Sequence, residues 1–98
     1  FTGGVINAEE ALKIGLVNRV IEHEKLIEEA IKLAVTICDK APIAVKYSKE
    51  AINRASECDT DTAVMIESSL FGLCFATDDQ KEGMGAFLEK RKPEFKNR

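Results

Sequence analysis

The sequence predicts a mainly α-helical fold, and three observations carry that prediction. Apolar residues recur at helical spacing, not in strict alternation, through most of the 98 residues. Pro42 stands where it suits the first turn of a helix. Good helix-capping residues precede three of the periodic segments: Asn7, Asp59 or Thr60, and Thr77. We therefore expect one domain, residues 1–98, with about five helices and a short extended strap.

The first helix is expected over residues 8–14. Asn7 precedes it, and Glu10 follows three residues later, which is the spacing of a capping box. Gly15 then ends the helix, because glycine readily adopts the left-handed conformation found beyond helix C-termini. The β-branched residues 16–21 are interpreted as an extended strand or strap.

The second and third helices are expected over residues 24–39 and 43–54. The apolar face of the second helix comprises Ile27, Ala30, Ile31, Ala34, Ile37 and Cys38. The third helix has a thin face of mostly small residues, which allows a neighbouring helix to approach closely: Ala44, Tyr47, Ser48, Ala51 and Ala55.

The fourth helix is expected over residues 60–76, and its second half, residues 70–75, is apolar on nearly every side. This pattern indicates burial on more than one face, against another chain or an absent domain; an internal core helix is the alternative. The fifth helix begins after Thr77, with Gln80 at capping-box spacing, and is expected to end at Pro93. Asp78 and Asp79 are interpreted as first-turn residues that suit the helix dipole.

Charge is distributed unevenly along the chain. The net charge is −3, whereas the last ten residues alone carry +3. An acidic body argues against a nucleic-acid partner. The basic end predicts contact with an anion, or else a solvated, frayed terminus. Its cations are Lys90, Arg91, Lys92, Lys96 and Arg98.

The cysteines and the single histidine show no metal-binding spacing. Cys38, Cys58 and Cys74 are scattered, and His23 lies between two glutamates at a helix start, where we interpret it as solvated. Unpaired thiols fit a cytoplasmic protein. No apolar run approaches the ~20 residues of a membrane span, and no signal peptide is evident. Because the chain begins at Phe1, we expect a fragment or a processed product.

The sequence contains no recognisable catalytic set, since no nucleophile stands beside a base and no carboxylate pair shares an apolar pocket pattern. The basic end is the remaining candidate for a binding site. Lys90, Arg91 and Lys92 could hold phosphates, while Phe87 or Phe95 could offer an aromatic face to a base. A ligand that contains a nucleotide presents both features.

The run from Phe75 to Phe95 closely resembles the C-terminal signature of enoyl-CoA hydratases of the crotonase family, especially its short-chain 3-hydroxybutyryl-CoA dehydratase branch. Four upstream pieces resemble the same family in the same order, so the likeness covers essentially the whole chain. They are Phe1-Thr2-Gly3, Ala8-Glu9-Glu10-Ala11, Gly15-Leu16-Val17-Asn18, and Ala41-Pro42 through Lys49-Glu50-Ala51-Ile52-Asn53.

The resemblance implies the C-terminal helical domain of the ClpP/crotonase-like fold, without its ββα-spiral core. In that family the spiral core holds the oxyanion-hole amides and two glutamates that add or remove water. No catalytic residue and no metal ligand can therefore be assigned here, and the chain alone is expected to be inactive. The CoA thioester would be a substrate, and no cofactor is implied.

The resemblance also implies site residues and partners. Phe87 and Lys90 match positions near the adenine and phosphates of CoA, and Phe71 and Phe75 match a region lining the acyl end or the subunit interface. The expected partners are the missing spiral domain and further copies of the chain, as a trimer or hexamer in the parent or by helix exchange, with no nucleic acid or membrane. Two alternatives stay open: a stand-alone helical partner-binding module, or another crotonase-superfamily enzyme such as an enoyl-CoA isomerase.

Overall fold

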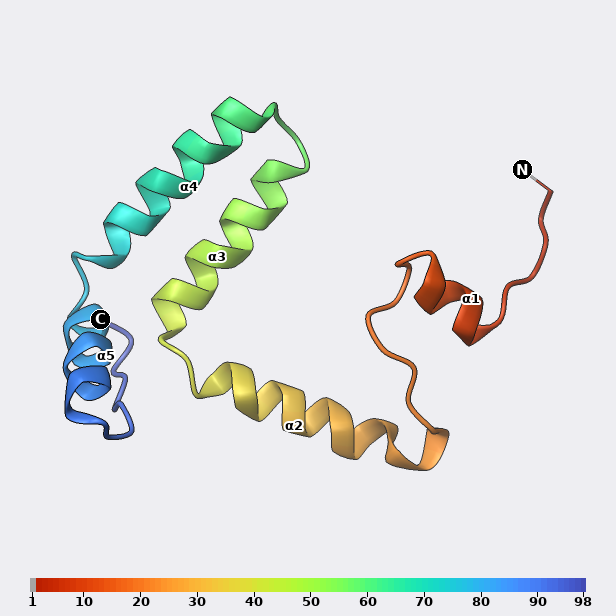
Figure 1. Cartoon of the computed structure of the whole chain (residues 1–98), viewed down its shortest axis with the longest axis horizontal. Coiled ribbons are helices and arrows are strands. Elements are labelled where there is room, and N and C mark those ends of the chain that lie inside the picture. The colour runs from red at the N-terminus through yellow and green to blue at the C-terminus, as the bar shows by residue number, and fades with distance from the viewer. Residues whose placement is uncertain (1) are drawn as a thin grey trace. The chain divides into compact units, whose positions relative to one another are not determined.

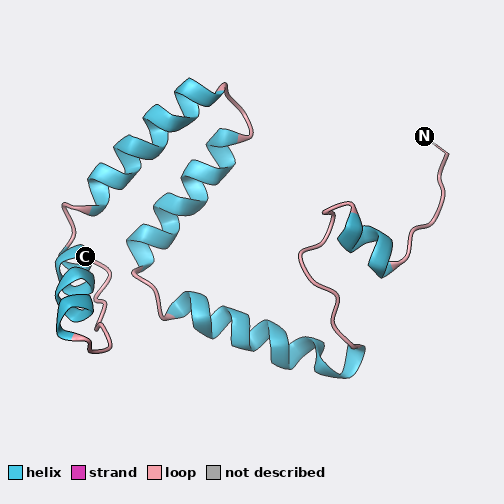
Figure 2. Ribbon diagram, viewed as in Figure 1, coloured by secondary structure: helices cyan, strands magenta, loops and turns pink. Residues whose placement is uncertain are grey.

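The computed structural model describes residues 2–98, and its regular structure is helical, as predicted. No strand is assigned within this range (Figures 1 and 2). The chain divides into two compact units, residues 1–34 and 35–98, with the boundary inside α2. The elements are α1 (Ala8–Lys13), the 3₁₀ turn η1 (His23–Lys25), α2 (Leu26–Cys38), α3 (Pro42–Ala55), α4 (Thr60–Cys74) and α5 (Asp78–Glu89).

The first unit confirms the predicted helix start and stop. Asn7 Oδ1 accepts a hydrogen bond from the Glu10 amide at 2.8 Å, and a Glu10 carboxylate oxygen accepts one from the Asn7 amide at 3.0 Å. Gly15 has a φ of +76° and ends the helix. The strand reading of residues 16–21 is wrong, because this segment pairs with no strand and forms a loop. The expectation for Phe1 lies outside the described residues.

The apolar face predicted for the second helix is present but largely uncovered. Within α2, Ile27 is 70% exposed and Ile31 is 58% exposed, and no residue of the helix is buried. His23 is exposed in η1, as the sequence predicts. No helix of residues 2–98 combines the length and apolar character that crossing a bilayer requires.

In the second unit, α3 and α4 lie side by side as an antiparallel hairpin (Figure 1). The half-buried residues of α3 include Ala44, Tyr47 and Ala51, which belong to the predicted face of mostly small side chains. The half-buried residues of α4 recur three or four positions apart, on one face: Ala63, Ile66, Leu70 and Cys74. Because helices pack through such stripes, these two faces account for the hairpin.

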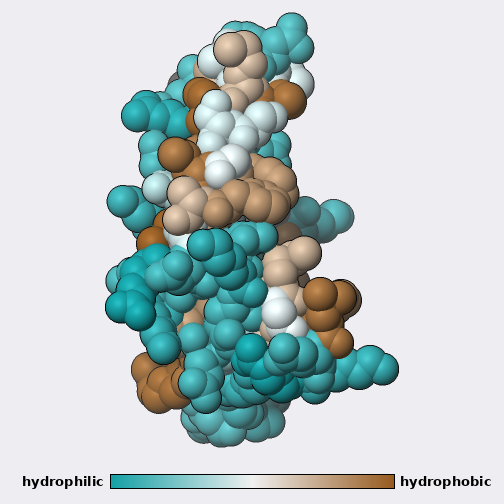
Figure 3. All heavy atoms as spheres, turned by 90° about the vertical axis from the view of Figure 1, so that its left-hand side faces the viewer, coloured by the Kyte–Doolittle hydropathy of each residue, from teal (hydrophilic) through white to brown (hydrophobic). Residues whose placement is uncertain are grey.

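The second half of α4 leaves large apolar side chains open to solvent. Phe71 is 64% exposed, Leu73 is 51% exposed and Phe75, just beyond the helix, is 52% exposed. Figure 3 shows apolar side chains gathered over α4, above a mostly hydrophilic surface. The alternative of an internal core helix is therefore wrong, because this segment buries only one stripe.

The fifth helix begins as predicted and ends earlier than predicted. Thr77 caps it through a hydrogen bond from the Gln80 amide to the Thr77 hydroxyl at 3.1 Å. The helix stops at Glu89, before Pro93, because Lys90 takes the left-handed conformation with a φ of 55°. The residues after it, 90–98, are called the C-terminal tail below.

Candidate functional site

The C-terminal tail folds back along α5 and closes the start of that helix (Figure 1). The main-chain oxygen of Arg98 accepts hydrogen bonds from the amides of Asp78 at 2.8 Å and Asp79 at 3.1 Å. The first amides of a helix have no partner within the helix. Since the tail and Thr77 supply those partners here, the start of α5 offers no open anion site.

Asp79 is the buried anchor of the tail. Its side chain is 2% exposed, and its two carboxylate oxygens accept the amides of Lys96 at 2.6 Å and Asn97 at 2.8 Å. A carboxylate that accepts main-chain hydrogen bonds makes short, charge-assisted contacts. The reading of the terminus as frayed is therefore wrong. Sequence reasoning placed Asp79 in the first turn, as observed, but missed its burial.

Glu82, on α5, binds two residues of the C-terminal tail, Arg91 and Glu94. Arg91 donates a hydrogen bond to it from each terminal nitrogen, at 2.5 Å from Nη1 to Oε1 and 2.9 Å from Nη2 to Oε2. The amide of Glu94 donates to the same Oε1 at 2.8 Å. Arg91 Nε also donates to Glu89 at 2.6 Å. The guanidinium fork matches a carboxylate in this bidentate geometry.

These contacts shift the pKa values of both partners. The hydrogen bonds from Arg91, and then the amide of Glu94, lower the pKa of Glu82 from 4.5 to about 2. Hydrogen bonds to Glu82 and then Glu89 raise the pKa of Arg91. Both groups therefore stay charged throughout the neutral range, and the contact persists there.

Lys90 occupies a backbone conformation that usually belongs to glycine. Its amide donates to the carbonyl of Phe87 at 3.3 Å, and the Arg91 amide donates to the carbonyl of Ala86 at 3.0 Å, so the helix ends in a Schellman turn. The left-handed conformation costs a residue with a side chain roughly 1–2 kcal/mol. Gly15 makes the equivalent turn after α1. A lysine at the second site is therefore strained locally.

The structure sorts the cations of the tail into paired and unpaired side chains. Arg91 pairs with Glu82 and Glu89, Lys92 with Asp39 at 3.3 Å, and Arg98 with Asp78 at 3.6 Å. In the part of the chain that the structure describes, Lys90 and Lys96 carry no ion pair, and both are exposed. Of the three adjacent cations singled out by the sequence, Lys90 alone is left open to an external anion.

The two candidate aromatic residues at this end have different surroundings. Phe87 is 80% exposed. Phe95 is half-buried, and its ring lies against α5 at Gly83, where a Cβ atom would be 3.4 Å from Phe95 Cε1. The ring of Phe95 therefore serves internal packing, and Phe87 is the open aromatic face. The site brings Phe87 and Lys90 to the same helix end.

Phe71 and Phe75 belong to α4 and its end, and contact each other. Their ring centroids are 5.2 Å apart, and the planes cross at 70°, an edge-to-face arrangement. Among the interactions of residues 2–98, none links this pair with Phe87 or Lys90. Phe71 and Phe75 thus form a contacting pair at the end of α4, while Phe87 and Lys90 lie at the end of α5.

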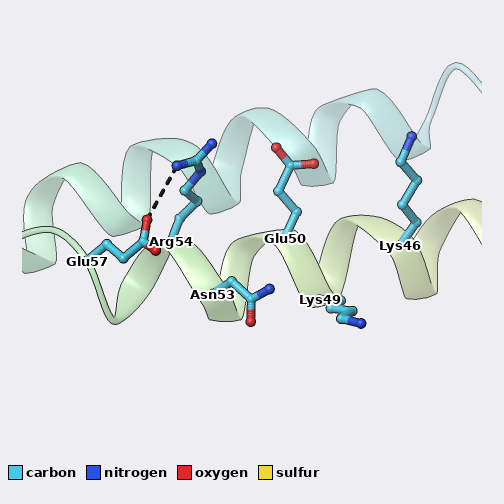
Figure 4. A pocket seen from close by; sticks show the side chains of 6 residues that line it. All are labelled: Lys46, Lys49, Glu50, Asn53, Arg54 and Glu57. Carbon is cyan, nitrogen blue, oxygen red and sulfur yellow. Dashed lines mark hydrogen bonds and ion pairs between the residues drawn. The ribbon is translucent and has the colours of Figure 1, made fainter.

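The hollows on the surface do not bring reactive groups together. A depression of about 370 Å³ lies along α3, lined by Lys46, Lys49, Glu50, Asn53, Arg54 and Glu57. Figure 4 shows Lys46, Glu50 and Arg54 extending from one side of the helix, while Lys49 and Asn53 point the other way. Among residues 2–98, no group of three or more potential metal ligands is present. We assign no catalytic or metal-binding role to this depression.

Comparison with protein-family models connects this geometry to a family. The model described as enoyl-CoA hydratase/isomerase matches residues 1–98, the whole chain. The chain belongs to the enoyl-CoA hydratase/isomerase family. Known members that resemble it include a short-chain-enoyl-CoA hydratase of Clostridium acetobutylicum, 57% identical over 99 residues, and a crotonyl-CoA hydratase of Syntrophomonas wolfei, 55% identical over 95 residues.

The chain corresponds to only part of these family members. It is covered completely by the match to the Clostridium acetobutylicum protein and to 97% by the match to the Syntrophomonas wolfei protein, yet spans 38% and 36% of their lengths. The matched part is their C-terminal portion. A crystal structure of an enoyl-CoA hydratase from Geobacillus kaustophilus superposes with a TM-score of 0.93 at 40% identity, covering 99% of this chain and 37% of that one. The helical arrangement is therefore a crotonase-fold segment.

We predict that acid weakens the C-terminal turn through Glu82. The pKa of this carboxyl is lower in the folded chain, about 2, than its ordinary 4.5, so the unfolded chain binds the proton more readily. The stabilisation from the carboxylate is complete above pH 4.5 and is lost as the pH falls through about 2. Carboxyl-detected NMR should show Glu82 titrating near pH 2.

Glu82→Gln should reduce the stability change in that acid window, as measured by urea unfolding at a series of pH values; Glu29 and Asp59, whose pKa values are also lowered by hydrogen bonds, account for part of what remains. Glu57→Gln is the matched control, since Glu57 forms a more exposed ion pair with Arg54 at 3.4 Å. A Glu82 midpoint close to 4.5 would contradict the assignment.

Proposed function

We propose that this chain is the C-terminal helical portion of a short-chain enoyl-CoA hydratase. The parent enzyme adds the oxygen of water to C3 and a proton to C2 of a trans-2-enoyl-CoA, and runs the reverse dehydration of 3-hydroxybutyryl-CoA. The observation that supports this most strongly is 57% identity along the whole chain to a protein named short-chain-enoyl-CoA hydratase. The relatives quoted above are named hydratases, which favours hydration over isomerisation.

In this proposal the catalytic groups belong to the part of the enzyme that precedes these helices. The chain spans 38% of the Clostridium acetobutylicum hydratase, and the hollow along α3 holds diverging side chains, not an acid–base pair. The helices would instead cover the CoA end of the substrate and join subunits. The three free cysteines fit a cytoplasmic enzyme.

We predict that the 98-residue chain alone does not hydrate crotonyl-CoA, whereas the full-length enzyme does. The physical reason is that stabilisation of the enolate-like transition state requires oxyanion-hole donors that these helices do not supply. Loss of absorbance by the conjugated thioester measures the rate. Hydration by the isolated chain at the full-length rate would overturn this division of roles.

Lys90 and Phe87 are the residues proposed to contact CoA. Lys90 carries an exposed ammonium group without an ion pair in the described chain, and Phe87 exposes most of its ring. An ammonium group binds phosphate by charge, and an aromatic face stacks on a nucleobase. CoA presents both phosphates and adenine. The local strain at Lys90 also fits a functional position, because strained backbone tends to persist at ligand sites.

We predict that Lys90→Ala and Lys90→Gly weaken CoA binding equally, by roughly tenfold, because each removes one charged hydrogen bond. Isothermal titration of CoA into the full-length enzyme measures the affinity. Lys90→Gly should be more stable than Lys90→Ala by about 1 kcal/mol, since glycine relieves the left-handed strain. Lys81→Ala is the control for loss of an exposed lysine from α5. Lys81 differs from Lys90 because its ammonium group lies 3.9 Å from the Asp78 carboxylate, and no CoA contact is proposed for it. Unchanged affinity in both Lys90 variants would remove Lys90 from the site.

Phe71 and Phe75 are proposed to line a subunit contact or the acyl end of the substrate site. They form an exposed aromatic pair at the end of α4, and exposed apolar surface of this kind often marks an interface. In the parent enzyme, the spiral domain and neighbouring subunits would cover this surface, in a trimer or hexamer. The isolated chain would cover it by self-association or helix exchange.

We predict that the isolated chain self-associates in a concentration-dependent manner and that Phe71→Asp shifts it toward the monomer. A charge placed in an apolar contact is costly to desolvate. Sedimentation velocity across a hundredfold concentration range provides the measurement. Ile52→Asp is the control, because Ile52 is an exposed apolar residue of α3. A clean wild-type monomer at high concentration would contradict the proposal.

A further inference from the structure

We propose that Glu82 and Arg91 are positioning residues that hold Lys90 in place for the CoA end of the substrate. This inference rests on the proposed contact between Lys90 and CoA. Neither Glu82 nor Arg91 is proposed to contact CoA, but their side chains pair next to the strained Lys90. This pair is not predicted from the sequence, because nine positions separate the two residues.

Glu82 ties α5 to the chain that follows Lys90. Glu82 accepts hydrogen bonds from Arg91, directly after Lys90, and from the amide of Glu94, on the far side of Pro93. The carboxylate of Glu82 therefore holds the chain that follows Lys90, while α5 itself holds the chain that precedes it. A bidentate guanidinium contact restricts rotation as well as distance. With the helix fixed before Lys90 and Arg91 fixed after it, the left-handed conformation of Lys90 is imposed by its surroundings.

The charges around Lys90 are already neutralised by partners within the chain. Arg91 is engaged by Glu82 and Glu89, and Lys92 by Asp39, so each cation beside Lys90 already has an anionic partner. An unpaired arginine next to Lys90 would itself bind phosphate, and more than one binding geometry would result. By neutralising Arg91, Glu82 leaves a single cation at the turn. The pair thus defines where a phosphate is held.

The energetic consequence is a change in the population of the binding-competent turn. Without the Glu82 contact, relaxation of Lys90 out of the left-handed region relieves strain and moves its ammonium group. If the competent turn falls to about one fifth of the molecules, the apparent dissociation constant rises about fivefold. The chemical step is unaffected, because it takes place at the other end of the substrate.

The test compares two substrates in the full-length enzyme: crotonyl-CoA, and the N-acetylcysteamine thioester of crotonate, which keeps the reacting group but lacks the nucleotide. We expect Glu82→Gln to raise KM for crotonyl-CoA about fivefold with kcat unchanged. For the short thioester, kcat/KM should stay at the wild-type value. Arg91→Lys, which keeps the charge but loses the fork, should give an intermediate KM. A purely structural role would lower kcat/KM for both substrates together and would overturn the inference.

A double-mutant cycle separates this inference from the proposed function. On a Lys90→Ala background, Glu82→Gln should add little to KM, since the residue it positions is gone. If Lys90→Ala leaves KM for crotonyl-CoA unchanged, the proposed contact fails and the positioning role fails with it. If Lys90→Ala raises KM and Glu82→Gln does not, only the positioning role fails. Glu57→Gln is the control for loss of an exposed carboxylate. Arg91→Lys replaces Glu82→Gln in the cycle if the latter does not fold.

Discussion

The order of the C-terminal end depends on hydrogen bonds from the tail to carboxylates of α5, and Glu82 is the one nearest the turn. Glu82 accepts hydrogen bonds from the guanidinium of Arg91 and from the amide of Glu94, and so joins α5 to the chain that follows Lys90. Asp79, about one turn earlier on the helix, likewise accepts hydrogen bonds from two amides of the tail. Because both acceptors lie on one rigid helix, the tail takes a single path along it.

This arrangement determines which charges remain available to a ligand. Three of the five cations at the basic end are used internally, and an otherwise unremarkable lysine is left open at the helix end. The same folding turns the ring of Phe95 onto α5 and leaves that of Phe87 exposed.

The large apolar side chains, unlike the charged ones of the tail, mostly lack partners within the described chain. Ala11, Ala86 and Asp79 are the buried residues of the described chain, while the large side chains of α2 and the second half of α4 stay open. Small chains bury a limited share of their surface, and this one represents little more than a third of its quoted relatives. The large apolar side chains of these helices are therefore left without an extensive core of the chain's own to cover them.

The sequence by itself determined the helices and the family. Capping at Asn7, Asp59 and Thr77 and the glycine stop at Gly15 act over three or four residues, so local spacing predicts them. Only the tertiary structure decided the state of the tail, the early end of α5 and the choice of Lys90 among its neighbours. The pairing of the tail cations depends on contacts between residues 9 to 53 positions apart, such as Arg91 with Glu82 and Lys92 with Asp39, and no local period encodes them. The early end of α5 depends on the left-handed backbone of Lys90, a conformation that is unusual for a lysine and that the sequence does not signal.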